Sequence, residues 1–140
     1  MPFPPTCPEV PVRSLSDALA CYRDRLGFTV DWSDDDLGLA GVSQGDSRLF
    51  LADAGYRADQ GNAAPVVLWI NASDRDEVDA IHARWRSAGA IILAAPEAKP
   101  WKLYEFTAQD PDGNRLRVFY DFGWEEAAGP EDGAQTEATP

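Results

Sequence analysis

Ser14-Leu-Ser-Asp-Ala-Leu-Ala-Cys-Tyr-Arg-Asp-Arg-Leu-Gly27 is the segment with the clearest structural signal in the chain. Ser14, followed three residues later by Asp17, has the form of a capping box, which opens a helix. Apolar residues then recur at helical spacing as far as Leu26, and Gly27 can adopt the left-handed backbone that ends a helix. The stretch therefore predicts an amphipathic helix.

The same pattern occurs a second time. Ser73-Asp-Arg-Asp76 again has the capping form, apolar residues follow on one helical face, and Gly89 stands at the expected end. A short extended run precedes each helix, Glu9-Val-Pro-Val12 in the first half and Val66-Val-Leu-Trp-Ile70 in the second. Three runs typical of strands follow each helix. The sequence therefore predicts two βαβββ modules, at about residues 8–53 and 65–122.

Pairing two such modules predicts an α+β fold in which curved mixed sheets surround a concave cavity and the helices lie outside. The strands after the helices are expected at residues 28–33, 37–42, 47–52, 90–93, 103–108 and 114–121, and the turn formers Asp110-Pro-Asp-Gly-Asn114 join the last two. One domain, residues 1–123, holds both modules, with a surface linker at residues 53–64. Residues 124–140 are acidic and poor in apolar side chains, which predicts a flexible tail. A ligand is expected in the concave cavity.

Composition excludes several classes of protein. At 140 residues with a formal charge of −12, the chain is one acidic domain whose field repels the phosphates of nucleic acids and anionic membranes. No apolar run approaches the roughly 20 residues that a membrane span needs, and no secretion signal precedes residue 7, so we expect a cytoplasmic protein. The two cysteines, Cys7 and Cys21, form no CxxC motif and predict reduced thiols.

Two segments, residues 11–28 and 110–118, resemble the glyoxalase/bleomycin-resistance/dioxygenase superfamily, also called vicinal oxygen chelate proteins, over about residues 8–122. The resemblance is closest to the bleomycin-resistance proteins, through residues 24–28, the acidic residues 34–36, and Pro100-Trp101 ahead of residues 104–106. Those proteins are dimers that sequester a cationic glycopeptide drug. The resemblance implies a homodimer, with Pro11 as the hinge at which the N-terminal strand could cross to the partner. Locally, Pro11 indicates only an edge strand, because proline donates no ladder hydrogen bond.

In the enzymes of this superfamily, His and Glu side chains from the first and last strands of each half hold a divalent ion. The matching positions here are Cys7, Phe50, approximately Pro65, and Arg117. A phenyl ring, an imino acid and a permanent cation donate no lone pair to a metal, and one thiol does not hold an ion. We therefore expect no metal, no cofactor and no catalytic residue. The sole histidine, His82, is expected on the outer side of its helix in a structural or solvent-facing role.

The resemblance also implies an aromatic clamp formed by Trp32 and Trp101. Two indoles offer stacking and cation–π attraction of roughly 0.5–2 kcal/mol per contact; the alternative is that both rings cover a sheet edge. Acidic side chains near the clamp would meet the cationic groups of a ligand, unless the run of residues 34–36 is a solvated turn. The full candidate ligand-binding set is Trp32, Trp101, Asp31, Asp35, Leu37, Val67, Trp69, Tyr104, Glu105, Phe106 and Phe119.

These observations support three hypotheses from different classes. The first is a metal-free, homodimeric binding protein that sequesters a planar, cationic natural product, such as a bleomycin-type antibiotic, and so confers antibiotic resistance. The alternative is a metal-dependent or cofactor-free lyase or dioxygenase of the same superfamily, with Glu105 or Asp53 as the general base. The third is a structural or regulatory partner protein whose cavity is filled by Trp69 and Phe119.

Overall fold

A computed structural model describes residues 1–60 and 64–128, with side chains as far as Glu125. The elements of the first module are β1 (Glu9–Pro11), α1 (Leu15–Ala20), a π-helical turn η1 (Cys21–Arg25), β2 (Thr29–Asp34), β3 (Leu39–Gln44) and β4 (Ser47–Ala52). After a short 3-10 turn η2 (Ala58–Gln60) come β5 (Val67–Asn71), α2 (Arg75–Ser87), β6 (Ile91–Ala98), β7 (Leu103–Gln109), β8 (Arg115–Asp121) and α3 (Gly123–Ala128). None of the helices in the described part of the chain could span a lipid bilayer.

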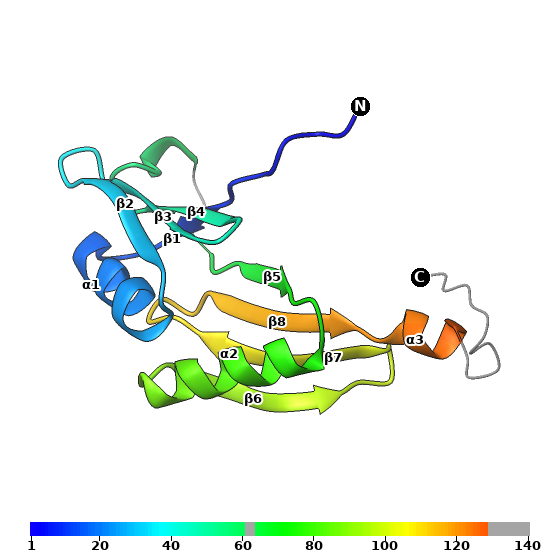
Figure 1. The fold of residues 1–140 in the computed structure, drawn as a ribbon. Coiled ribbons are helices and arrows are strands. Elements are labelled where there is room, and N and C mark those ends of the chain that lie inside the picture. Colours follow the sequence, from blue (N-terminus) through cyan, green and yellow to red (C-terminus); the bar gives the residue numbers. More distant parts are fainter. Residues whose placement is uncertain (61–63, 129–140) are drawn as a thin grey trace.

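Each module builds one four-stranded mixed sheet, in the orders β1-β4-β3-β2 and β5-β8-β7-β6. The pairs β1 with β4 and β5 with β8 are parallel, and the remaining pairs are antiparallel. The two sheets therefore have the same topology, which confirms the predicted α+β fold with two βαβββ modules. Figure 1 shows the two sheets beside each other, with α1 under the first and α2 against the second.

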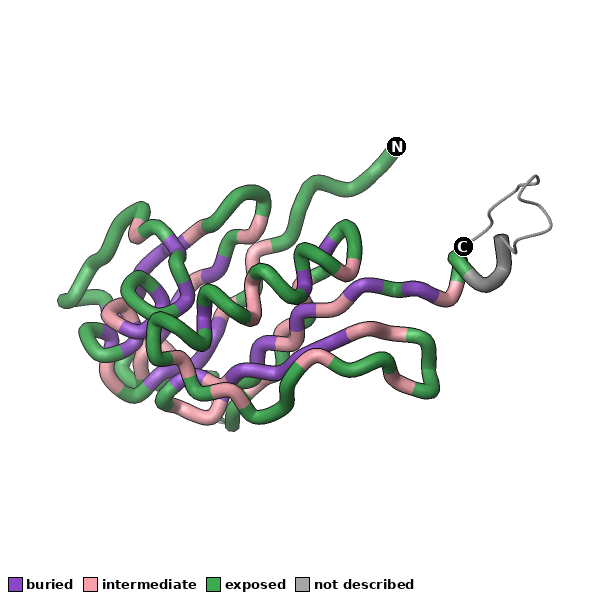
Figure 2. Tube along the Cα trace, turned by 60° about the horizontal axis from the view of Figure 1, so that its bottom comes forward, coloured by how far each residue is buried: buried purple, intermediate pink, exposed green. Residues whose placement is uncertain are grey.

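The helices cover one face of each sheet, and the described part of the chain leaves the other face open. Side chains that point toward the helices, such as Leu51, Phe106 and Val118, are fully buried. Figure 2 shows these buried stretches along the strands, flanked by exposed loops and by an exposed N-terminal segment. A single chain thus presents two open faces, called the free faces below, in place of the expected cavity enclosed by its own two modules.

One core runs through both modules. The Trp85 ring of α2 packs against Phe106 at a centroid distance of 5.6 Å, and its indole N–H donates to the carbonyl of Leu26 at the end of η1, at 2.9 Å. His82 also contacts Phe106, with ring centroids 5.1 Å apart. The expectation that His82 points outward is wrong, because its position on α2 shares the inward face with Val78 and Trp85, both of which are buried.

A buried polar network also joins the modules. Asp110 and Asn114, at the two ends of the β7–β8 turn, have no exposed surface. The Tyr22 hydroxyl donates to Asp110 Oδ2 at 2.9 Å. Asn114 Nδ2 donates to the Pro11 carbonyl at 2.8 Å, while Asn114 Oδ1 accepts from the Val66 amide at 2.9 Å. One turn therefore fixes η1, β1 and the start of β5. Burial and the Asp110 carboxylate raise the pKa of Tyr22 well above its ordinary value, so the phenol remains a donor.

Local details depart from the sequence predictions at two places. Ser14 caps α1 as predicted, but the N-cap of α2 is Asp74. Ser73 instead donates its amide and hydroxyl to Glu77, at 2.7 and 2.9 Å, which lowers the pKa of Glu77. The tail was expected to lack structure from residue 124, yet α3 extends through residue 128; the expected flexibility of residues 129–140 falls outside the described residues.

The first strand is short and lies at the edge of its sheet, as Pro11 predicts. It pairs in parallel with β4 of the same chain, with Glu9 opposite Phe50 and Pro11 opposite Ala52. The Pro11 carbonyl is held by Asn114, as described above. Exchange of this strand with a second copy stays a prediction.

The polar network predicts an unequal effect of two matched substitutions. Tyr22→Phe leaves the buried Asp110 with one hydrogen bond fewer and should lower the free energy of unfolding by about 1–3 kcal/mol. Tyr104→Phe removes a similar bond to Asp79, but at a partly exposed site, and should cost less than about 1 kcal/mol. Urea unfolding followed by circular dichroism measures both. Equal losses in the two variants would contradict the assigned role of Asp110.

Two free thiols should differ in reactivity. Burial, with a contribution from Asp110, raises the pKa of the Cys21 thiol to about 11, so little thiolate forms at pH 8. Cys7 is partly exposed. In the folded protein a disulfide reagent at pH 8 should therefore modify Cys7, and Cys21 roughly 100-fold more slowly. The Cys7→Ala variant should react only after unfolding in urea; rapid reaction of this variant in its folded state would show that Cys21 is accessible.

Candidate functional site

Strand register decides which side chains lie on the free face of the second sheet. Thr107, Arg117 and Trp69 stand opposite one another on β7, β8 and β5. Glu105 and Phe119 form the next row on the same face. Successive residues of a strand point to opposite faces. This face therefore carries aromatic and charged side chains next to each other.

A hollow of about 420 Å³ lies on this face. Its walls include Trp101, Glu105, Lys99, Arg115 and Arg117. The Trp101 side chain is 59% exposed, and its indole N–H donates to Glu105 Oε1 at 2.9 Å. Glu105 is only 4% exposed. The buried carboxylate thus fixes the orientation of an exposed indole ring at the edge of the hollow.

The turn between β6 and β7 presents Trp101 through an unusual backbone. Lys102 has a φ of 73°, in the left-handed region that side chains other than glycine rarely adopt. Its amide donates to the Lys99 carbonyl at 2.9 Å, which closes a tight turn. The Lys99 ammonium lies 5.8 Å from the centre of the Trp101 ring. Positive backbone φ values of this kind gather at functional sites.

A second aromatic group adjoins the hollow. The rings of Trp69 and Phe119 meet edge to face, with centroids 5.5 Å apart, and the Arg117 guanidinium lies 5.1 Å from the Trp69 ring. Trp69 is nevertheless 47% exposed, so its contact with Phe119 leaves half of its surface open. Trp69 and Val67 also line a groove of about 540 Å³ at the border with the first module, together with Arg48.

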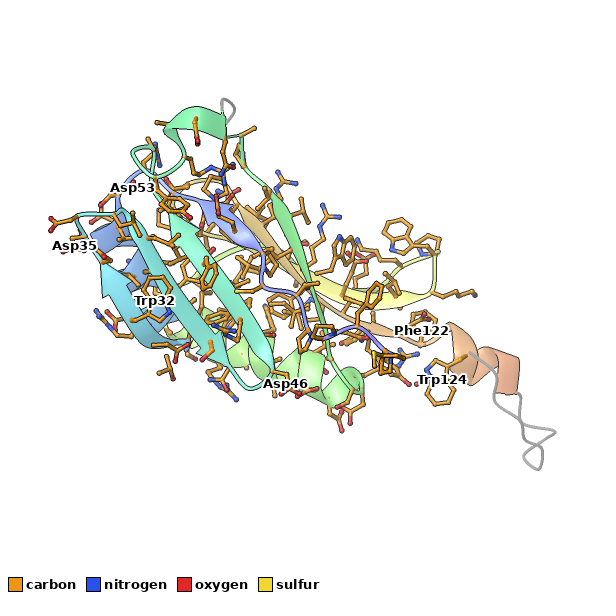
Figure 3. All side chains as sticks on the ribbon, turned by 90° about the horizontal axis from the view of Figure 1, so that it is seen from above. Trp32, Asp35, Asp46, Asp53, Phe122 and Trp124 are labelled. Carbon is orange, nitrogen blue, oxygen red and sulfur yellow. The ribbon has the colours of Figure 1, made fainter. Side chains whose placement is uncertain are left out.

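On the first sheet, Trp32 lies flat on the backbone. A Cβ atom at Gly41, its register partner on β3, would stand 2.5 Å from the indole nitrogen, so only glycine leaves room for the ring. Phe50 meets Trp32 edge to face at 5.6 Å. Figure 3 shows Trp32 on the strands of this sheet. The ring remains 39% exposed and covers the free face of the first module.

The expected ligand-binding residues divide into three groups. Trp101, Glu105, Val67, Trp69 and Phe119 share the free face of the second sheet. Trp32, Asp31, Asp35 and Leu37 belong to β2 and the turn after it, and Figure 3 shows Asp35 at the end of the first sheet away from the second. Tyr104 and Phe106 point toward α2, where the Tyr104 hydroxyl donates to Asp79 at 2.6 Å and Phe106 is fully buried.

Two physical reasons explain this division. Tyr104 and Phe106 flank Glu105 in the sequence, so strand alternation places them on the opposite face from it. The residues that line the hollow around Trp101 all lie between Leu93 and Arg117, so Trp32 of the same chain is not part of it. Sequence reasoning missed Lys99 and Arg115 as site residues. The spacing of Arg115 and Arg117 on β8 was the signal that could have identified two cations on one face.

The acidic run after β2 forms a turn. The Asp34 carboxylate accepts from the Leu37 amide at 3.0 Å, and the Ser33 hydroxyl donates to Asp35. Asp53, one of the two carboxylates expected as a base, accepts from the Tyr56 amide at 3.0 Å and packs against Gly38. Asp53 is therefore engaged in loop structure. Of the two expected bases, only Glu105 lies in the hollow.

The positions that match metal ligands do not fit a divalent ion. Cys7 and Pro65 lie outside β1 and β5, and the register places Glu9 opposite Phe50 and Trp69 opposite Arg117. Glu9 is the one oxygen donor of the four, and it forms an ion pair with Arg57. The described residues contain no group of three or more His, Cys, Asp or Glu that could hold a metal.

Comparison with known proteins gives a consistent result. Residues 7–118 match the family model described as Glyoxalase/Bleomycin resistance protein/Dioxygenase superfamily. A search of curated proteins found no match. Similar solved structures include a glyoxalase/bleomycin resistance protein/dioxygenase from Nocardioides (TM-score 0.70, 21% identity, covering 86% of this chain and 85% of the other). A second is lactoylglutathione lyase from Agrobacterium tumefaciens (TM-score 0.71, 23% identity, covering 89% of this chain and 98% of the other). A third is TioX from Micromonospora sp. ML1 (TM-score 0.70, 18% identity, covering 84% of this chain and 99% of the other). At these identities the likeness concerns the fold.

The close approach of Trp32 to Gly41 predicts a specific effect of a methyl group. Gly41→Ala should displace the indole from the sheet, increase quenching of Trp32 emission by acrylamide, and destabilise the protein by about 1–3 kcal/mol. Ser43→Ala, at the next position of β3 on the same face, is the matched control and should change neither quantity. Unchanged quenching in Gly41→Ala would show that Trp32 does not rest on the strand.

Proposed function

The chain belongs to the glyoxalase/bleomycin resistance protein/dioxygenase superfamily, and we propose that it is a homodimeric binding protein that sequesters a planar aromatic natural product, such as a bleomycin-type antibiotic. Sequestration needs a shaped aromatic surface and no catalytic group. The observation that carries the proposal is the orientation of Trp101. An exposed indole, fixed by a buried carboxylate beside a hollow, is ordered before any ligand arrives, which lowers the entropic cost of binding.

Exposed aromatic surface supports a binding role. Trp32, Trp69 and Trp101 all lie on free faces and keep from a third to more than half of their surface in water. Each indole offers a flat face for stacking and a favourable site for a cation.

Charge supports a dimer in which two copies share the site. The free face of the second sheet bears Arg115 and Arg117, whereas the first module bears the acidic turn at residues 34–36. A two-fold axis would set the first module of one copy against the second module of the other, twice. Trp32 of one copy would then stand opposite Trp101 of the other, which forms the clamp that a single chain does not contain. Asp31 and Asp35 would meet the cationic groups of the drug.

A titration with bleomycin tests the proposal. Binding should quench tryptophan emission, with a Kd in the micromolar range or lower by calorimetry, and sedimentation should show a dimer. Trp101→Ala should weaken binding by about 2- to 30-fold, since each aromatic contact contributes roughly 0.5–2 kcal/mol. Trp124→Ala is the control, because Trp124 belongs to α3 and lies beyond the end of the second sheet (Figure 3).

Three results would contradict the proposal. A panel of planar aromatic antibiotics that gives neither heat nor quenching would exclude sequestration of this class of ligand. A monomer in the presence of ligand would exclude the shared clamp. Stoichiometric iron, nickel, manganese or zinc in the purified protein, measured by elemental analysis, would favour the alternative of a metal-dependent lyase or dioxygenase.

A further inference from the structure

The hollow beside Trp101 has the opposite charge to the chain as a whole. The formal charge of the chain is −12, with only 12 lysine and arginine residues. Three of these basic residues, Lys99, Arg115 and Arg117, line the hollow, and Glu105 is its one acidic lining residue. Since an acidic chain gains nothing in solubility from grouping its few cations, this arrangement indicates a local function.

The two guanidinium groups lack an anionic partner. Neither Arg115 nor Arg117 forms an ion pair with any residue that the structure describes. Arg117 Nε is buried and has no hydrogen-bond partner within that part of the chain. A buried donor of a charged group without an acceptor is unfavourable. An anion supplied from outside would remove this cost.

The neighbouring side chains orient these cations. The Trp69 ring lies 5.1 Å from the Arg117 guanidinium, and stacking of this kind holds the planar group. Arg115 and Arg117 are two residues apart on β8, so both point to the free face. Glu105, the carboxylate that lines the hollow, could compete with a ligand for these arginines. It already accepts a hydrogen bond from the Trp101 indole N–H. The donors of β8 are thus left for a ligand.

We propose that this hollow binds the carboxylate of a planar aromatic acid, whose ring stacks on Trp101 and whose carboxylate pairs with Arg115 and Arg117. The inference rests on the proposed function and adds that the part of the ligand next to Trp101 is negatively charged. Arginine and carboxylate form short, charge-assisted bonds in a bidentate geometry. A volume of about 420 Å³ suits a small ring system, while the net charge of −12 disfavours a polyanion. The acidic turn of the first module remains free for cationic groups of the same ligand.

Three probes that share the naphthalene ring system but differ in charge test the inference: 2-naphthoate, 2-naphthamide and 2-naphthylmethylammonium. Calorimetry with the unmodified protein should show that naphthoate binds at least tenfold more tightly than the amide, and that the ammonium compound binds most weakly. The advantage of naphthoate should fall between 50 and 500 mM sodium chloride, because salt screens the ion pair.

Two arginine variants assign the preference to β8. Arg115→Gln and Arg117→Gln should each weaken naphthoate binding at least fivefold and change naphthamide binding less than twofold. Arg86→Gln, near the end of α2, is the matched control and should leave both affinities unchanged. Arg117→Gln removes the contact with Trp69 and could disturb that ring. Arg115 is exposed, so Arg115→Gln should fold normally and provides an independent test.

The outcomes separate the two proposals. If the amide or the ammonium compound binds as tightly as naphthoate, and Trp101→Ala abolishes that binding, aromatic sequestration stands and the preference for a carboxylate is excluded. If naphthoate keeps its advantage in both arginine variants, the assignment to Arg115 and Arg117 is excluded. If none of the three probes binds at millimolar concentration, the proposed carboxylate site is excluded, and the titration with bleomycin decides aromatic sequestration separately.

Discussion

The buried pair of Asp110 and Asn114 is the constraint on which the arrangement of this protein depends. A carboxylate and an amide without exposed surface are tolerated only when their hydrogen bonds are made, and here the partners come from both modules. Tyr22, Pro11 and Val66 are thereby held against one turn. This contact fixes the two sheets beside each other, with their helices packed into one core.

That arrangement determines where recognition can take place. Because the helices occupy one face of each sheet, the remaining faces are open to other molecules, and their tryptophans belong to different modules. The first face has Trp32 and an acidic turn; the second has Trp101, a buried glutamate and two arginines. The residues that would grip opposite sides of one ligand therefore lie on separate surfaces of each chain, and the proposed site requires two copies.

Sequence reasoning was accurate where the signal is local or repeated. Helical periodicity, the cap at Ser14 and the turn formers at residues 110–114 predicted the modules, because each depends on neighbours in the chain. It was less accurate where side-chain direction mattered. Tyr104 and Phe106 were carried over together with Glu105, although alternation separates them. Register across β1 and β5 depends on partners distant in sequence, and Cys7 and Pro65 lie outside the two strands in which they were expected.

The contact of Trp32 with Gly41 has a consequence for how such a site can diversify. A ring that rests on bare peptide is supported by atoms common to every residue, so substitution of the strand beneath it can only remove the support. The part of the first face beneath Trp32 therefore tolerates little substitution. The second face is lined instead by side chains of β7, β8 and the turn at Lys102. Ligand preference among proteins built on this plan would therefore change through the second module while the first stays constant.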